Sequence, residues 1–147
     1  MKLHQLSLFL ENTPGALKMP CRLLADAGIN ILTLNLADTA EFGILRLIVK
    51  DWQRARDVLT QAGCVVNVAE VIAIDVPDRP GGLAGLLDVF DSEKLGITYI
   101  YAFTHRLEDK HTAIIVRFDD PDRAVEVMSR HQIHAVATAD LFARVKA

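Results

Sequence analysis

One short motif occurs twice in this chain of 147 residues. In each copy two polar residues precede a Pro-Gly step, which is Pro14-Gly15 in the first copy and Pro80-Gly81 in the second. Proline suits the first position of a helix, and the polar residues before it can cap the free amides of that helix. Apolar runs that suit strands precede the motif, and helical patterns follow it. We therefore expect each copy to join a strand to a helix.

Apolar periodicity predicts the same order of elements in both halves. The first half is expected to contain strands at 2–10, 29–38 and 42–49, helices at 14–27 and 51–62, and a last strand that starts at Cys64. The long apolar run 64–76 divides near Ala69-Glu70 into this strand and the first strand of the second half. The second half is expected to contain helices at 80–94 and 120–131, strands at 97–104, 111–118 and 133–140, a polar turn at 105–110 and a tail at 141–147.

The two halves align at a nearly constant offset in sequence number. The offset is 66 at the Pro-Gly steps, 68 at the Gly-Ile steps (28–29 and 96–97) and 69 in the second helices. Each half therefore predicts a β-α-β-β-α-β unit, and the fold class is α+β with two ferredoxin-like repeats and antiparallel sheets. The expected domains are residues 1–69 and 70–147. Because a unit of about 70 residues is marginally stable alone, we expect the repeats to pack side by side.

Composition excludes several classes of partner. The formal net charge is −3, and a nucleic-acid partner would require a basic face. No apolar run approaches the roughly 20 residues of a membrane span, and no signal layout is present, so we expect a cytoplasmic protein. Cys21 and Cys64 are expected to be small buried thiols. The aromatic face of Tyr99, Tyr101 and Phe103 is similar to an RNA-binding sheet, but the acidic balance favours a core or interface role.

The motif and its surroundings resemble the ACT domain. The first copy, residues 12–17, is followed by Gly28-Ile29-Asn30-Ile31, and the second, residues 78–83, by Gly96-Ile97-Thr98-Tyr99. The resemblance covers essentially the whole chain, as two ACT repeats. ACT domains are regulatory modules that bind amino acids or similar small metabolites and pair through their sheets. The resemblance therefore implies an effector site at the interface between repeats, between the first loop of one and the start of the second strand of the other.

The residues that the resemblance assigns to ligand binding lie in the two loops and at the starts of two strands. They are Asn12, Thr13, Pro14, Gly15, Ala16, Leu17, Asn30, Ile31, Asp78, Arg79, Pro80, Gly81, Gly82, Leu83, Thr98 and Tyr99. A helix N-terminus attracts a carboxylate, and the side chain of Asn12 or Asp78 could accept a hydrogen bond from an ammonium group. Asn12 and Asp78 either contact the ligand or act only as helix caps. Arg79 either pairs with a ligand carboxylate or is solvated. Because the two loops differ in charge, they need not bind the same ligand.

Metal binding and catalysis have weaker support. His131 lies three residues before His134, and His105 and His111 flank the expected polar turn. No cysteine or carboxylate joins either pair in a recognised ligand spacing, so no metal site is predicted. The chain also lacks the sequence motifs of nucleophilic, phosphate-binding and dinucleotide-binding enzymes, so we expect no enzymatic activity.

We therefore expect a regulatory or sensor protein that binds a small metabolite, most readily an amino acid, and needs no cofactor. Binding would be allosteric, because a ligand shifts packing only if it prefers one arrangement. The signal would pass to a partner enzyme or regulator or through a homodimer, which exposed sheet edges favour. The alternative is a structural or protein–protein interaction module that binds no ligand; a metal-responsive regulator and a small enzyme are less favoured.

Overall fold

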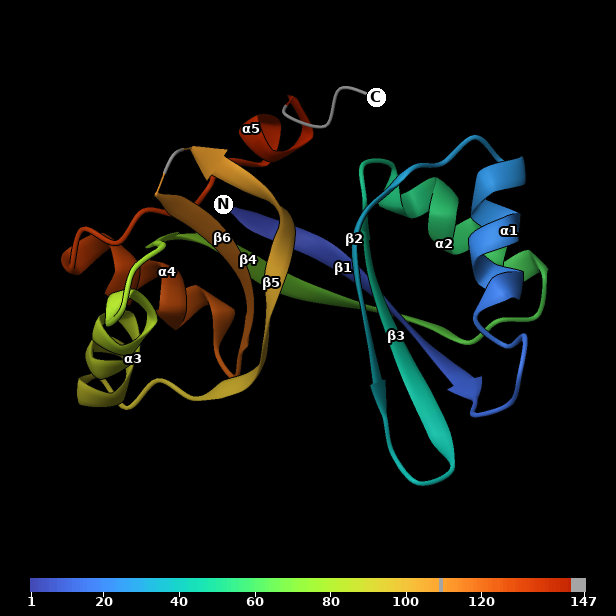
Figure 1. The fold of residues 1–147 in the computed structure, drawn as a ribbon, viewed down its shortest axis with the longest axis horizontal. Helices are drawn as coiled ribbons and strands as arrows, with labels where there is room; N and C mark the ends of the chain where they lie inside the picture. The colour runs from blue at the N-terminus through green and yellow to red at the C-terminus, as the bar shows by residue number, and fades with distance from the viewer. Residues whose placement is uncertain (109, 144–147) are drawn as a thin grey trace. The chain divides into compact units, whose positions relative to one another are not determined.

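The computed structural model describes residues 1–108 and 110–143 (Figure 1). Within these residues the α+β fold follows the predicted order of strands and helices with two differences. The two strands expected within 64–76 form one continuous strand, and a helix takes the place of the last expected strand. The elements are β1 (Lys2–Glu11), α1 (Lys18–Asp26), β2 (Ile31–Asp38), β3 (Phe42–Val49), α2 (Trp52–Gln61), β4 (Val66–Pro77), α3 (Gly82–Ser92), β5 (Ile97–Glu108), β6 (His111–Phe118), α4 (Pro121–Arg130) and α5 (Thr138–Ala143).

The chain divides into two compact units. Residues 4–69 form the first unit, and residues 1–3 together with the described residues from Glu70 onward form the second. The second unit ties its N-terminal residues down through Lys2, whose Nζ lies 2.8 Å from the carboxylate of Glu70 and 2.7 Å from that of Asp122. These two carboxylates hold the pKa of Lys2 above its usual range. No helix of the described residues is long and apolar enough to cross a membrane.

In the first unit β3 pairs antiparallel with both β1 and β2. Figure 1 shows α1 and α2 together on one face of these strands. Because side chains alternate along β1, every second residue, namely Leu6, Leu8 and Leu10, is buried in the core next to the two helices, as the sequence predicts. The buried residues of this core are Leu6, Leu8, Leu10, Leu24, Ile29, Leu45, Leu47, Val49, Ala55 and Leu59.

The second unit repeats this arrangement, with β6 between β4 and β5 and antiparallel to both. Helices α3 and α4 lie on one face of the strands (Figure 1). Phe90 on α3 packs edge to face against Phe118 on β6, with ring centroids 5.1 Å apart. The buried residues of this core are Ile72, Ile74, Val76, Phe90, Leu95, Ile114, Val116, Phe118, Ala124, Val127 and Met128.

The second helix of each unit begins with the same cap. The side chain of Asp51 accepts a hydrogen bond from Arg54 N at 3.2 Å, and that of Asp120 accepts one from Arg123 N at 3.0 Å. Each bond satisfies an amide that the first turn of a helix leaves unpaired. The predicted alignment of the second helices therefore holds at the level of individual hydrogen bonds.

The predicted closing strand 133–140 is wrong. This segment pairs with β4 at an isolated bridge between Ile74 and Ala135, where Val136 N donates to Ala73 O. Beyond the bridge, Asp140 N and Leu141 N donate to the carbonyl oxygen of Ala137, which is a helical pattern. The chain thus turns into α5, which buries Leu141. The polar turn expected at 105–110 is also displaced, because β5 continues to Glu108. Residue 109 and the end of the expected tail, 144–147, lie outside the described residues.

Candidate functional site

Both Pro-Gly motifs form the same type II β-turn. In the first, Ala16 N donates to Thr13 O at 3.2 Å, and Gly15 has a φ of +85°. In the second, Gly82 N donates to Arg79 O at 3.0 Å, and Gly81 also has a φ of +85°. A type II turn takes proline at its second position and requires a positive φ at its third, which glycine adopts without strain. The repeated motif is therefore a repeated backbone conformation.

This geometry corrects the expected role of the prolines and polar residues. Pro14 and Pro80 occupy turns rather than the first helical position, and the helix caps are Leu17 for α1 and Gly81 for α3, neither of which forms a side-chain cap hydrogen bond. Asn12 and Asp78 are therefore not helix caps. Helix α1 begins at Lys18 because a helix from residue 14 would place Pro20 in its interior, where it can donate no hydrogen bond; in α1 it lies in the first turn.

The glycines of the turns differ in what surrounds them. A Cβ atom built on Gly15 or Gly81 meets nothing within 4 Å, so both turns face open space. A Cβ atom on Gly82 would lie 2.1 Å from the carbonyl oxygen of Pro77. Helix α3 therefore begins directly against the end of β4, two residues earlier in the motif than α1 begins in the first copy.

The expected correspondence of Gly28 with Gly96 is wrong. Gly28 (φ +70°) donates to Ala25 O just after α1, and the residue that does this after α3 is Lys94 (φ +53°), which donates to Asp91 O. The offset of the Pro-Gly steps therefore continues unchanged to the ends of these helices. Gly96 instead lies beside another side chain, since a Cβ atom there would lie 2.5 Å from a carboxylate oxygen of Asp119, which would have to shift.

With this same offset, the counterparts of Asn30 and Ile31 are residues 96 and 97. The expected pair Thr98 and Tyr99 therefore lies two residues further along β5. The loop 12–17, Asn30 and Ile31 belong to the first unit. The loop 78–83, Thr98 and Tyr99 belong to the second unit. A site that joins both sets stays a prediction. The buried side chains of Tyr101 and Phe103 are not available for stacking on nucleic-acid bases.

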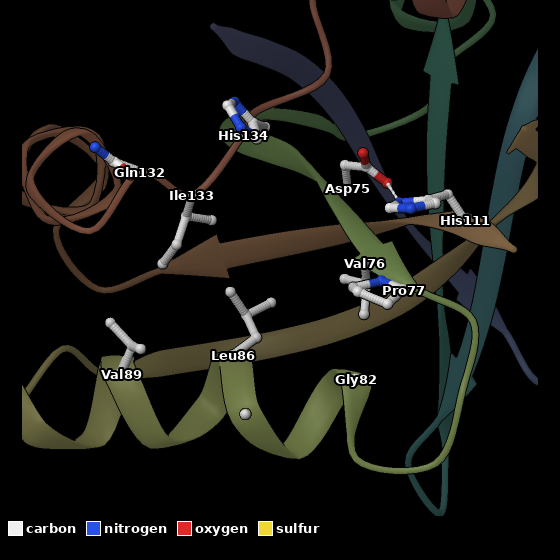
Figure 2. A pocket seen from close by; sticks show the side chains of 11 residues that line it. Asp75, Val76, Pro77, Gly82, Leu86, Val89, His111, Gln132, Ile133 and His134 are labelled. Atoms are coloured by element: carbon white, nitrogen blue, oxygen red, sulfur yellow. Dashed lines mark hydrogen bonds and ion pairs between the residues drawn. The ribbon is translucent and has the colours of Figure 1, made fainter.

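A cavity of about 300 Å³ lies in the second unit (Figure 2). Of the residues that the sequence assigned to ligand binding, only Gly82 lines it. Figure 2 shows Leu86 and Val89 pointing from α3 towards Ile133, which follows α4, while Asp75 and His111 lie on the side away from the helix. The remaining lining residues are Val76, Pro77, Gly85, Gln132 and His134. Sequence patterns missed this cavity because its residues come from four separate segments.

Two histidines of the second unit, His111 and His131, lie within hydrogen-bonding distance of a carboxylate. His111 Nδ1 lies 2.9 Å from Asp75 Oδ1 at the cavity. His131 Nε2 lies 2.7 Å from Glu93 Oε1, and Arg130 contacts the other oxygen of the same carboxylate at 3.0 Å. The hydrogen bond from His131, with help from Arg130, holds the pKa of Glu93 below its usual range. In residues 1–108 and 110–143 no group of three or more histidine, cysteine, aspartate or glutamate residues could hold a metal ion.

Two ferredoxin-like halves with matching Pro-Gly turns define a tandem-repeat α+β fold. The chain belongs to the ACT domain pair family, whose sequence model matches residues 1–145. It is similar to protein BT0572 from Bacteroides thetaiotaomicron, with 34% identity, a TM-score of 0.88, and coverage of 97% of this chain and 96% of that one. A search of curated proteins gives no match.

Two more distant structures share the fold. The regulatory subunit of aspartate kinase from Thermus flavus has 18% identity and a TM-score of 0.64, with 88% of this chain and 90% of that one covered. The ligand-free regulatory subunit from Thermus thermophilus has 15% identity and a TM-score of 0.61, with 86% and 91% covered. The chain thus spans nearly the full length of each of these proteins.

Proposed function

We infer that the protein is a regulatory module that binds a small metabolite of the amino-acid class through its two Pro-Gly turns. The observation that carries this proposal is that both turns keep one geometry, with a left-handed glycine facing open space. Two distant structural neighbours are regulatory subunits of a kinase. In the second loop α3 begins at once, so its unpaired first amides and partial positive charge lie next to the turn and suit a carboxylate.

The module would act by binding rather than by chemistry. A bound effector stabilises whichever arrangement of the protein it prefers, and the output passes to a partner enzyme or regulator, or to a homodimer. Under this proposal the ligand contacts extend to Asn30 and Ile31 in the first unit and to Thr98 and Tyr99 in the second.

A thermal-shift screen of the twenty amino acids against the full chain tests the proposal. A ligand at 100 times its dissociation constant adds about 2.7 kcal/mol, and each kcal/mol raises the melting temperature of a chain of this size by about 2–4 °C. A shift with one amino acid or a few related ones supports the proposal. No shift with any amino acid in a folded sample refutes it.

A pair of variants locates the binding. Gly81→Asn keeps the left-handed conformation, which asparagine tolerates, and places a side chain in the open space at the turn. Gly63→Asn is the matched control, because Gly63 has a φ of +89°, faces open space and lies after α2. The ligand-induced shift should be lost in Gly81→Asn and kept in Gly63→Asn. If both variants keep the full shift, the second loop does not bind the ligand.

A protein-interaction module remains the second candidate, because the first unit exposes large apolar side chains on its strands. Phe9, Leu34, Leu36 and Phe42 are each 44–54% exposed. Exposed apolar surface of this kind marks contact with another protein. Analytical ultracentrifugation of the full chain should show a dimer if a second copy covers these residues, and a monomer if none does.

A further inference from the structure

The cavity of the second unit has an apolar side and a polar side. Leu86 and Val89 on α3 and Ile133 after α4 converge on one side, and the Asp75–His111 pair lies on the other (Figure 2). Gly85 faces the cavity without a side chain, and a Cβ atom there would meet nothing within 4 Å. The volume of about 300 Å³ stands at the lower end of the range for ligand pockets, about 300–1,000 Å³. A small amphiphilic molecule fits these properties.

The first unit shows that the repeat fold does not impose this lining. Strand pairing identifies the counterparts, since Glu11 faces Phe42 in β3 as Pro77 faces His111 in β6. By the same register Phe9 stands in the place of Asp75. The ion pair of the second unit is therefore replaced by two phenylalanines in the first.

The apolar side of the cavity differs between the units in the same way. At the offset of the Pro-Gly steps, Met19 on α1 is the counterpart of Gly85 on α3. At the offset of the second helices, Cys64 and Val65 are the counterparts of Ile133 and His134. The sulfur of Met19 lies 3.9 Å from that of Cys64, so this side chain reaches from the helix to the segment after α2. Of the two units, only the second combines a glycine at this position with a charged pair and a second histidine.

We propose that this cavity is a binding site, separate from the Pro-Gly turns, for an α-amino acid with a short branched aliphatic side chain. The aliphatic group lies against Leu86, Val89 and Ile133, the ammonium group is accepted by the carboxylate of Asp75, and the carboxylate receives hydrogen bonds from the imidazoles of His111 and His134. The inference shares with the proposed function only the class of ligand, because it uses different residues.

The test titrates the full chain with L-leucine and follows the backbone amides by NMR. 4-Methylpentanoate, which is leucine without the ammonium group, and isoamylamine, which is leucine without the carboxylate, are the comparison ligands. Leucine should shift the backbone amides of residues 75, 76, 85–89 and 132–134 and bind at least about tenfold more tightly than either analogue, because each analogue forfeits one charge-assisted interaction. Equal binding of an analogue overturns the assignment of the head group.

Gly85→Met gives the second unit the residue that the first unit has and fills the cavity from the helix. Ala84→Met is the matched control, because it adds the same side chain to the neighbouring, exposed position of α3, which does not line the cavity. Asp75→Asn removes the ammonium acceptor, with Asp88→Asn on exposed α3 surface as its control. Gly85→Met should abolish the shifts at the cavity, and Asp75→Asn should weaken binding about ten- to hundredfold.

The outcomes separate this inference from the proposed function. Shifts at the cavity that disappear in Gly85→Met and persist in Ala84→Met support the inference, whatever occurs at residues 12–17 and 78–83. Shifts confined to those two loops, unchanged in Gly85→Met, overturn the inference and leave the proposed function in place. No shift at the cavity with leucine, in a sample whose amide spectrum shows a folded protein, also overturns it.

Discussion

Replacing Gly82 by alanine should destabilise the second unit, although alanine is the better helix former. The added Cβ would lie 2.1 Å from the carbonyl oxygen of Pro77 and 3.2 Å from its carbonyl carbon. Both atoms belong to the backbone, so neither can rotate away. Either the end of β4 or the first turn of α3 must move, and the turn that joins them is closed by the hydrogen bond from Gly82 N to Arg79 O.

The size of the effect follows from overpacking, which costs about 1–3 kcal/mol when a methyl group enters occupied space. Little helix propensity offsets this cost, because Gly82 is the first residue of α3. The melting temperature should fall by about 2–4 °C for each kcal/mol lost. Gly85→Ala is the matched control, since its Cβ meets nothing within 4 Å and the helix interior gains up to about 1 kcal/mol.

Urea unfolding followed by circular dichroism measures both variants against the parent chain. The two substitutions are chemically identical and lie three residues apart on one helix, so their free energies of unfolding should change in opposite directions. A Gly82→Ala protein as stable as the parent would refute the steric argument. The first copy of the motif has Ala16 at this position, and there the helix begins two residues later. We expect Gly82→Ala to delay the start of α3 in the same way.

Three further predictions concern the two helix caps, the core of the second unit and the contacts of Glu93. Asp51→Ala and Asp120→Ala should each cost about 1 kcal/mol in urea unfolding, because the two caps have the same geometry; clearly unequal losses would contradict that equivalence. Phe90→Ala should cost about 3–5 kcal/mol by the same assay, since it empties a fully buried site, and a loss below about 1 kcal/mol would contradict it. Glu93 has a folded pKa below its usual value because of His131, so its stabilising effect is present above the usual value of 4.5 and is lost as the pH falls through the lower folded pKa. Unfolding midpoints between neutral and acidic pH should therefore depend less on pH in Glu93→Gln than in the parent, and equal dependence would contradict the assignment.

Periodicity and caps were sufficient to predict most of the fold. The alternating leucines of β1 are buried as expected, because each strand has one face under helices. Asp51 caps α2 as the sequence indicates, since a cap depends on neighbours three residues away. Local patterns of this kind can be predicted from a sequence because the interacting groups are close along the chain.

Features that depend on distant contacts were not predictable. The segment 133–140 has the apolar content of a strand, but burial of Leu141 and the carbonyl of Ala137 start a helix there instead. The sequence predicts that Gly96 ends a helix, whereas in the structure it lies against the carboxylate of Asp119, which follows another strand. A glycine can be required by backbone conformation or by a neighbour, and the sequence does not distinguish the two.

The cavity is invisible to sequence patterns for a related physical reason. Gly85 interrupts an apolar helical stripe, and taken alone it is only a weak helix former. Its significance depends on Ile133, which lines the same cavity but belongs to the segment after α4, far from Gly85 along the chain. The cavity therefore depends on residues that the fold brings together from separate segments, and in the second unit they include a hydrogen-bonded Asp75–His111 pair whose counterparts in the first unit are Phe9 and Phe42.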